Sequence, residues 1–220
     1  RTLRHLTPRR RHIRSAPTQA SRRPIAERGQ RIGLLGGSFN PAHDGHVEIS
    51  QLALGLLDLD EVWWLVAPQN PLKPEAGMAG MAERLAAADK IAAGTPIKVT
   101  CIEADLDTRY TADTLERLKS LYPGVHFVWL MGADNLVQIH HWVRWSSIFH
   151  AVPVAIFARP TYSLRAEKAK AARRFARYRI KPLRAAGLAT KRPPVWVLFK
   201  KPHNPMSATK LRRRKASGDT

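Results

Sequence analysis

The sequence predicts an α/β protein: a doubly wound parallel sheet with helices on both faces, formed by one domain over residues 29–220. From residue 31 onward, short apolar runs alternate with segments in which apolar residues recur at helical spacing. Some runs, such as 61–67, are apolar at nearly every position, which is typical of parallel strands buried on both faces. The first run, 32–35, leads through a glycine turn into a helical pattern, an order typical of ligand-binding α/β sheets.

Each strand is expected where β-branched and aromatic residues cluster between turn residues. The expected strands are 32–35, 61–67, 97–102, 125–131, 152–157 and 195–199. The expected helices are 47–54, 81–93, 112–121 and 164–178, and the last presents a solvated basic face. Asp44 and Thr111 are suitable N-caps for two of these helices. Cys101 is expected as a small buried residue of the third strand, because a single cysteine excludes an internal disulfide.

The net charge of +20 is unevenly distributed along the chain. Residues 1–28 hold nine Arg against one Glu (+8), residues 29–158 nine Lys and Arg against fourteen Asp and Glu (−5), and residues 159–220 nineteen against two (+17). A protein that coats nucleic acid more often spreads basic residues over one face of its core. The distribution therefore argues against nucleic acid as a partner, although basic ends can still bind polyanions.

The segment 1–28 is expected to be a disordered basic extension, because it is rich in Arg, Ser, Pro and Thr and has no apolar periodicity. It superficially resembles an organellar transit peptide, and a leftover translated leader on a bacterial protein is the alternative that we favour. No apolar run approaches the length of a membrane span, so no membrane association is expected. Together with the single cysteine, this favours a reducing, cytoplasmic location.

The segment 36–46, GGSFNPAHDGH, is the part of the chain that most clearly indicates chemistry. Gly36 and Gly37 let backbone amides approach a ligand without a Cβ in the way. His43 and His46 lie three residues apart across a helix start, so both imidazoles can face a group at that helix N-terminus. Such an end attracts anions through its N–H groups and its dipole. The combination predicts a phosphate-binding site.

H-x-G-H directly after G-G-S-F-N-P resembles the signature of the nucleotidyltransferase superfamily, which includes the class I aminoacyl-tRNA synthetases. An ordinary turn with two surface histidines is the alternative. Metal ligation is disfavoured because no nearby Cys or third His completes a ligand set. In such a sheet the ligand lies beyond the carboxyl ends of the strands, near the point where strand order reverses. After the last strand, the hydroxyls of Ser207 and Thr209 and the guanidinium of Arg212 are suited to phosphate.

Over about 33–212 the chain resembles the bacterial-type nicotinate-mononucleotide adenylyltransferases, a family with a Rossmann-like fold. Four segments carry the resemblance: 36–46 to the family's GGxFxPxHxGH, 109–115 to its YTxxTL, 131–135 followed by Trp142 to its GxD…W, and 206–212 (MSATKLR) to its ISxTxIR. The two internal segments separate this family from other members of the superfamily.

The resemblance implies that ATP binds at the glycine turn and that the 5′-phosphate of nicotinate mononucleotide attacks its α-phosphorus in line. Nicotinate adenine dinucleotide and pyrophosphate are the implied products. Because the attacking phosphate is already a nucleophile, catalysis is positioning and charge stabilisation without a covalent intermediate. His43, His46 and Arg212 are the implied catalytic residues. Mg²⁺ is the implied cofactor, bound through the ATP phosphates and water without a dedicated set of protein ligands.

The resemblance also assigns the substrate contacts. Those to ATP are Gly36, Gly37, Ser38, Phe39, His43, His46, Gly132, Asp134, Ser207, Ala208, Thr209 and Arg212. Those to the mononucleotide are Asn40, Lys73, Thr111 and Trp142. Asp134 with Gly132 would bind the adenosine ribose. Trp142 would stack on the nicotinate ring, and Thr111 would bind its carboxylate. A buried core position is the alternative for Trp142.

Other functions remain open at this point. A related adenylyltransferase could use the amide mononucleotide or phosphopantetheine, although an enzyme for phosphopantetheine should lack the YTxxTL and Trp142 elements. A tRNA synthetase fragment would explain H-x-G-H, but no segment is large enough for an anticodon-binding domain. A nucleic-acid-binding protein without catalysis leaves His43, His46 and Arg212 without a role. The expected partners are ATP and nicotinate mononucleotide, and a homo-oligomer is left open.

Overall fold

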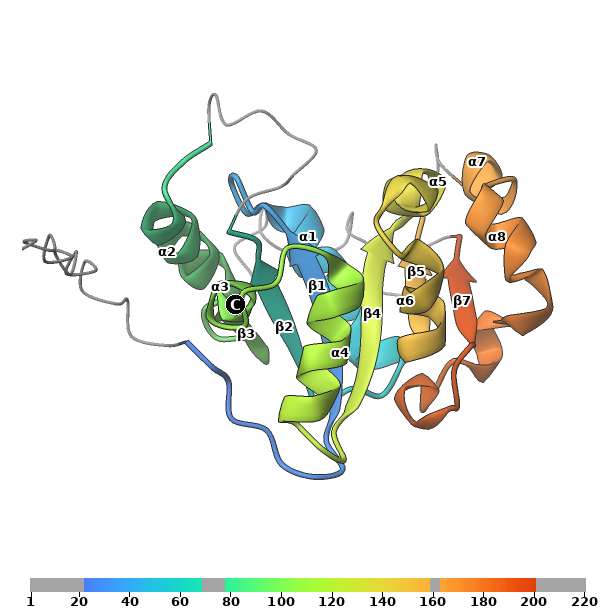
Figure 1. Ribbon diagram of the computed structural model, residues 1–220, viewed down its shortest axis with the longest axis horizontal. Coiled ribbons are helices and arrows are strands. Elements are labelled where there is room, and N and C mark those ends of the chain that lie inside the picture. Colours follow the sequence, from blue (N-terminus) through green and yellow to red (C-terminus); the bar gives the residue numbers. More distant parts are fainter. Residues whose placement is uncertain (1–21, 69–77, 159–162, 201–220) are drawn as a thin grey trace, which may run out of the picture.

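The computed structural model describes residues 22–68, 78–158 and 163–200. These residues form a seven-stranded parallel sheet with helices on both faces (Figure 1). The strand order is β3-β2-β1-β4-β5-β7-β6, so the chain runs from β1 outward to β3 and then returns to β4 on the other side of β1. The predicted doubly wound α/β fold is confirmed, and the strand order reverses between β1 and β4.

The strands fall close to their predicted positions. They are β1 (Arg31–Gly37), β2 (Glu61–Val66), β3 (Ile97–Thr100), β4 (His126–Gly132), β5 (Val154–Phe157), β6 (Arg179–Ile180) and β7 (Trp196–Phe199). The sequence pattern misses β6, because two residues at the edge of a sheet are too few to show periodicity. The six others lie within two residues of the predicted ends.

The helices form two layers. They are α1 (Asp44–Leu56), α2 (Met81–Ala92), α3 (Ile102–Asp105), α4 (Thr111–Leu121), α5 (Ala133–Gln138), α6 (Trp145–Ala151), α7 (Ser163–Glu167) and α8 (Lys170–Arg174), with 3₁₀ turns η1 (Ile139–His141), η2 (Ala176–Tyr178), η3 (Pro182–Arg184) and η4 (Leu188–Thr190). One core lies against α3 to α8, and the other against α1, α2 and the segment of η3 and η4. In Figure 1, α4 and α6 lie in front of the sheet, α5 lies at the upper end of β4, and α1 lies behind the sheet.

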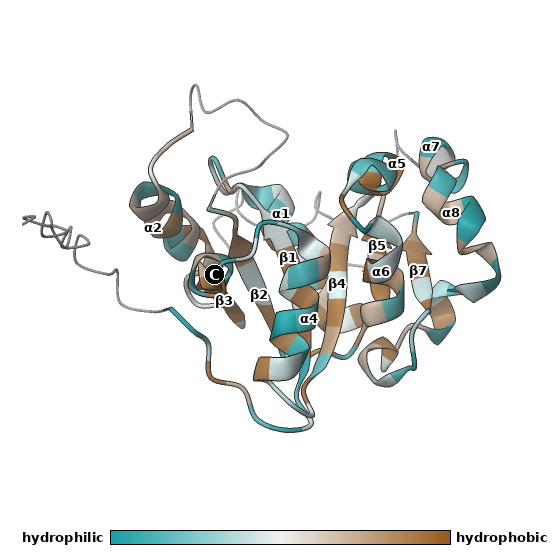
Figure 2. Cartoon of the chain, viewed as in Figure 1, coloured by the Kyte–Doolittle hydropathy of each residue, from teal (hydrophilic) through white to brown (hydrophobic). Residues whose placement is uncertain are grey.

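Strand β2 shows why the central strands are apolar at nearly every position. Trp63 and Leu65 belong to the core on the α4 face, and Trp64 and Val66 belong to the core on the α1 face. All four are fully buried. Alternate side chains thus enter opposite cores, and neither face of the strand meets water. In Figure 2 the strands are brown to pale, and most of the teal lies on helices such as α2, α4 and α8.

Two local predictions are wrong. The helix expected over 164–178 is broken at Ala169, whose extended backbone (ψ 147°) separates α7 from α8 and lets Ala171 and Phe175 turn into the core. Cys101 is buried as expected but lies between β3 and α3, because the hydroxyl of Thr100 accepts a bond from the backbone N–H of Ile102 and starts a turn there. The basic residues of α7 and α8 are exposed, as predicted.

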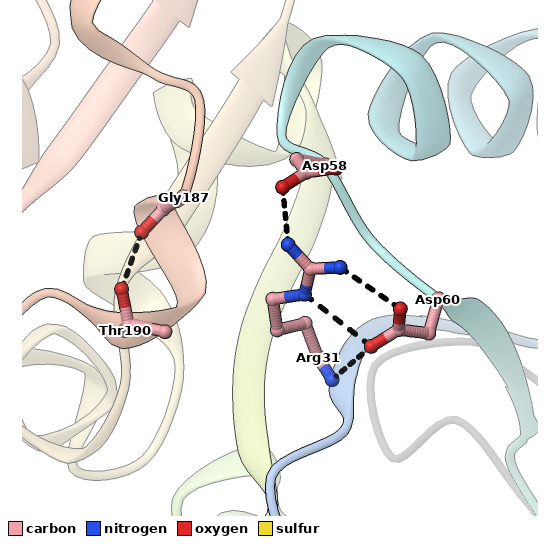
Figure 3. A network of polar contacts seen from close by, with 5 residues as sticks. All are labelled: Arg31, Asp58, Asp60, Gly187 and Thr190. Atoms are coloured by element: carbon pink, nitrogen blue, oxygen red, sulfur yellow. Dashed lines mark hydrogen bonds and ion pairs between the residues drawn. The ribbon is translucent and has the colours of Figure 1, made fainter.

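An ion-pair network joins β1 to β2 at the amino end of the sheet (Figure 3). The Arg31 guanidinium binds Asp60, with Nη2 3.0 Å from Oδ1, and also pairs with Asp58. The backbone N–H of Arg31 donates to Asp60 Oδ2 at 2.7 Å. Hydrogen bonds from Arg31 lower the pKa of Asp60. Since ligands bind at the carboxyl edge of such sheets, this network serves the fold.

No helix within the described ranges is long and apolar enough to cross a membrane.

Candidate active site

The carboxyl ends of β1 and β4 meet at the point where strand order reverses. Leu35 pairs with Leu130 at the end of the β1–β4 ladder, and the two strands end two residues further on, at Gly37 and Gly132. β1 leads into the H-x-G-H segment and α1, and β4 leads directly into α5. The fold therefore brings together the two described segments expected to hold ATP.

His43, rather than Asp44, is the N-cap of α1. Its Nδ1 accepts a hydrogen bond from the backbone N–H of Gly45 at 3.1 Å, and its own backbone N–H donates to Nδ1 of His46 at 3.2 Å. This reciprocal arrangement is a capping box made of two imidazoles in place of the usual hydroxyl and carboxylate. Asp44 is the first helical residue, where its charge is favourable to the helix dipole. The predicted cap was wrong because imidazole nitrogen can replace an Asp oxygen as the acceptor.

The capping box determines where the imidazole protons lie. An Nδ1 that accepts a hydrogen bond carries no proton, so each neutral ring holds its proton on Nε2. The two rings are close, with centroids 4.0 Å apart and planes inclined by 38°. His43 and His46 therefore have their Nε2–H groups as donors, the arrangement that a phosphate oxygen requires.

Aromatic rings pack against His46 and hold its imidazole in place. The Phe39 ring lies 4.6 Å from the His46 ring and stacks on Trp64 at 5.1 Å. Phe39 has a left-handed backbone (φ 46°), a conformation that costs a bulky residue about 1–2 kcal/mol. The whole residue is 1% exposed, so its ring is a packing element of the site.

A buried serine connects the same ring system to the backbone of α1. Ser50 is fully buried; its hydroxyl donates to the carbonyl of His46 at 2.8 Å and accepts from Nε1–H of Trp64 at 2.9 Å. The sequence analysis missed this residue. Its only signal is a hydroxyl on the apolar stripe of a helix, which is common in ordinary helices.

A buried arginine, also missed by the sequence analysis, holds the loops that follow β1 and β2. Arg84 of α2 is 3% exposed, and burial lowers its pKa. Its guanidinium donates to four backbone carbonyls: Ala79 (from Nε, 3.0 Å), Ser38 (Nη1, 2.7 Å), Ala67 (Nη1, 2.8 Å) and Pro68 (Nη2, 3.3 Å). Asn40, an exposed residue expected to contact the mononucleotide, strengthens the same junction by accepting from the backbone N–H of Ala79 at 3.2 Å.

Glycine is required at positions 36 and 132 of the site for two different structural reasons. A Cβ on Gly36 would lie 2.6 Å from the Trp129 ring, so this glycine makes room for packing inside the sheet core. A Cβ on Gly132 would lie 2.4 Å from Oδ1 of Asp134, so this glycine lets the carboxylate fold back across the start of α5. Asp134 is exposed at the carboxyl edge of the sheet.

The segments expected to hold the mononucleotide are joined by an ion pair. Arg144, in a left-handed conformation (φ 53°), lies two residues after Trp142 and pairs with Asp113 at 2.7 Å and with Glu116 of α4. Thr111 is the first residue of this helix and Tyr110 is its N-cap without a side-chain bond, so the expected Thr111 cap is wrong. Trp142 is half-buried and packs against the core, which leaves part of the ring accessible.

Several predicted site residues, namely Lys73, Ser207, Ala208, Thr209 and Arg212, lie outside the described residues. Most of the expected basic extension does so too. Within the described ranges, no group of three or more His, Cys, Asp or Glu side chains is arranged to hold a metal ion.

The fold and the site together define a nucleotide-binding α/β protein of the nucleotidyltransferase class: a glycine turn, an imidazole-capped helix and an acidic residue meet where strand order reverses. The cytidylyltransferase-like family model matches residues 34–214. The chain belongs to this family and, within it, to the nicotinate-nucleotide adenylyltransferases.

Relatives match most of the chain. A probable nicotinate-nucleotide adenylyltransferase from Parvibaculum lavamentivorans is 47% identical over 194 residues, covering 88% of this chain and 96% of the relative. One from Bradyrhizobium sp. is 50% identical over 182 residues, covering 83% and 95%. A solved Plasmodium falciparum nicotinic acid mononucleotide adenylyltransferase, complexed with APC, superposes with a TM-score of 0.58 over 84% of this chain and 83% of that chain. At 17% identity, the last supports the fold alone. The family and enzyme class predicted from the motifs are confirmed.

Proposed function

We propose that this chain transfers the adenylyl group of ATP to nicotinate mononucleotide, giving nicotinate adenine dinucleotide and pyrophosphate. The observation that carries the proposal is the imidazole capping box of His43 and His46, which follows β1 at the point where strand order reverses, next to the strand β4 that ends at Gly132. The names of the relatives supply the substrate class, and the joined segments of Thr111 and Trp142 are consistent with it.

In the proposed reaction an oxygen of the mononucleotide 5′-phosphate bonds to the α-phosphorus, and the bond from that phosphorus to the bridging oxygen of the β-phosphate breaks. The Nε2–H groups of His43 and His46 donate to oxygens of the α-phosphoryl group, where negative charge accumulates. The helix dipole of α1 acts in the same direction. Arg212, with the hydroxyls of Ser207 and Thr209, holds the departing pyrophosphate.

Mg²⁺ fits this donor set as a substrate-bound ion. The described residues at the start of α1 offer imidazole N–H groups and no carboxylate cluster, so phosphate oxygens and water would supply the octahedral coordination that Mg²⁺ prefers. When bound, the ion neutralises phosphate charge. We also propose a cytoplasmic location, where ATP is available.

The substrate assignment is tested by pyrophosphate release from ATP with nicotinate mononucleotide, the amide mononucleotide or phosphopantetheine as acceptor. The highest kcat/KM is expected with nicotinate mononucleotide. A preference for the amide or for phosphopantetheine would contradict the substrate while leaving the nucleotidyltransferase class intact. The absence of pyrophosphate release with every acceptor would overturn the proposed activity.

A further inference from the structure

A carboxyl group is buried at the base of the loop that precedes α4. Glu103 of α3 is 8% exposed, and no Lys, Arg or His in the described parts of the chain forms an ion pair with it. A lone ionised carboxylate in such a place is costly, so burial alone favours its neutral form. Nothing in the sequence motifs or in the proposed reaction uses this residue.

Glu103 belongs to a compact hydrogen-bonded cluster centred on the hydroxyl of Thr114. That oxygen lies 2.9 Å from Glu103 Oε1, 3.0 Å from Thr108 Oγ1 and 3.2 Å from the carbonyl oxygen of Tyr110. The backbone N–H of Thr108 donates to the carbonyl of Glu103 at 3.0 Å. The cluster therefore joins α3, the loop of residues 106–110 and the first turns of α4.

A count of hydrogens shows what this cluster requires. The Tyr110 carbonyl only accepts, and Thr108 and Thr114 each bring one hydroxyl hydrogen. When Glu103 is ionised, only the two hydroxyl hydrogens are available for the three contacts of the Thr114 oxygen. In one of these contacts, two oxygen atoms then face each other with no hydrogen between them. Thr108 Oγ1 also lies 3.5 Å from the Glu103 carbonyl, which adds to the shortage. With Glu103 protonated, it donates to Thr114, Thr114 donates to Tyr110 and Thr108 donates to Thr114, so all three contacts are satisfied.

We propose that Glu103 is a positioning residue that acts as a neutral carboxylic acid: its proton completes the cluster that fixes the loop 106–110, and thereby places Tyr110 and Thr111 at the mononucleotide end of the site. This inference rests on the proposed function of Thr111. Glu103 itself is buried behind the loop and acts on the substrate only through it.

The cluster makes binding of the mononucleotide depend on pH. Burial raises the pKa of Glu103 to about 7. The nearest ionisable side chains along the chain are Asp105 on α3, which pairs with Arg23 at 3.7 Å, Asp107 and Arg109 in the loop, and Asp113 on α4. No charged side chain contributes to the pKa of Glu103, and the hydrogen bond with Thr114 opposes the effect of burial without outweighing it. Above about pH 7 the cluster loses one hydrogen, and the loop is released. ATP binds at the other segment and should be insensitive to the change.

The test compares KM for nicotinate mononucleotide and for ATP in the wild type, Glu103→Gln and Thr114→Val, at about pH 6 and about pH 8.5. In the wild type, KM for the mononucleotide should rise on the order of tenfold with pH, as for a small misplacement of a binding group, while KM for ATP stays constant. Glu103→Gln, whose amide donates at any pH, should keep a low and pH-independent KM. Thr114→Val should have a high KM at both pH values.

Glu83→Gln provides the matched control, because Glu83 is an exposed carboxylate on α2. It should reproduce the wild-type pH profile. An identical pH profile in the wild type and in Glu103→Gln would overturn the inference.

A second measurement is independent of activity and so separates failure of the inference from failure of the proposed function. Isotope-edited infrared spectra should contain a carboxylic-acid C=O band at about pH 6 that Glu103→Gln removes and Glu83→Gln retains. Loss of this band in Glu103→Gln supports the inference even if no acceptor is turned over. A wild type without the band at that pH refutes it.

Discussion

The free energy of unfolding of Glu103→Gln, relative to that of the wild type, should increase as pH rises. Glutamine is nearly isosteric with glutamic acid, its amide can donate to Thr114, and it does not titrate. The substitution therefore removes the ionisation of Glu103 and leaves the packing of the cluster in place.

The expected magnitude follows from the change in pKa on folding. Burial raises the pKa of Glu103 from 4.5 to about 7. Each pH unit of this rise corresponds to about 1.4 kcal/mol, so the full effect is roughly 3 to 4 kcal/mol. Because the folded state binds the proton more tightly, the stabilising effect of protonation is complete below about pH 4.5 and is lost as pH rises through about 7. Relative to the wild type, the Gln variant should gain roughly 3 to 4 kcal/mol across this window.

Urea unfolding of both proteins at about pH 5, 6, 7 and 8 measures this quantity. The difference in the free energy of unfolding cancels the contributions of groups that the two proteins share. Glu83→Gln, with an exposed carboxylate, should show a difference that is nearly constant over the same range. A constant difference for Glu103→Gln as well, or one that decreases with pH, would refute the conclusion that folding raises the pKa of Glu103.

Three other substitutions test the site. His46→Ala should lower kcat by about a hundredfold or more, because the substitution removes a hydrogen-bond donor to the transition state. As a control, Glu48→Ala changes an exposed residue of the same helix and should leave kcat unchanged. A normal kcat in the His46→Ala enzyme would exclude this histidine from catalysis. Trp142→Ala should raise KM for the mononucleotide more than KM for ATP, whereas unchanged KM values with lower thermal stability would make Trp142 a core residue. Arg84→Met should lower the free energy of unfolding by about 3 kcal/mol or more, because four backbone carbonyls lose a charged hydrogen-bond donor. If urea unfolding showed the same stability as the wild type, these hydrogen bonds would be dispensable.

The parts of the fold that follow from local pattern could be predicted. The strand β2 is apolar at consecutive positions because each face meets a separate core, and that pattern is present in the sequence without knowledge of either core. The helix α2 was predicted to within one residue at its end. The helix expected over 164–178 was wrong because the packing of Phe175 on Phe149 of α6, a long-range contact with ring centroids 4.4 Å apart, decides where the chain turns.

The chemistry of the first loop was also predictable, because all of its elements lie within eleven consecutive residues, 36–46. Short motifs specify a local backbone shape and a set of donors, and both features survive when the rest of the chain is unknown. The same sequence did not show that His43 would be the cap instead of Asp44. That choice depends on the exact dihedral angles at the helix start, for which several polar residues are nearly equivalent.

By itself, the sequence determined the alternation of strands and helices, the phosphate-binding turn and the family, since each depends on residues that are neighbours along the chain. The tertiary structure alone decided the roles of Arg84 and Glu103. The Arg84 guanidinium binds a carbonyl 46 positions away, and the Glu103 carboxyl group is hydrogen-bonded to the hydroxyl of Thr114, 11 positions away. The physical reason is that the state of a buried charge is set by how many donors, acceptors and apolar atoms surround it in space, and no local pattern records that number.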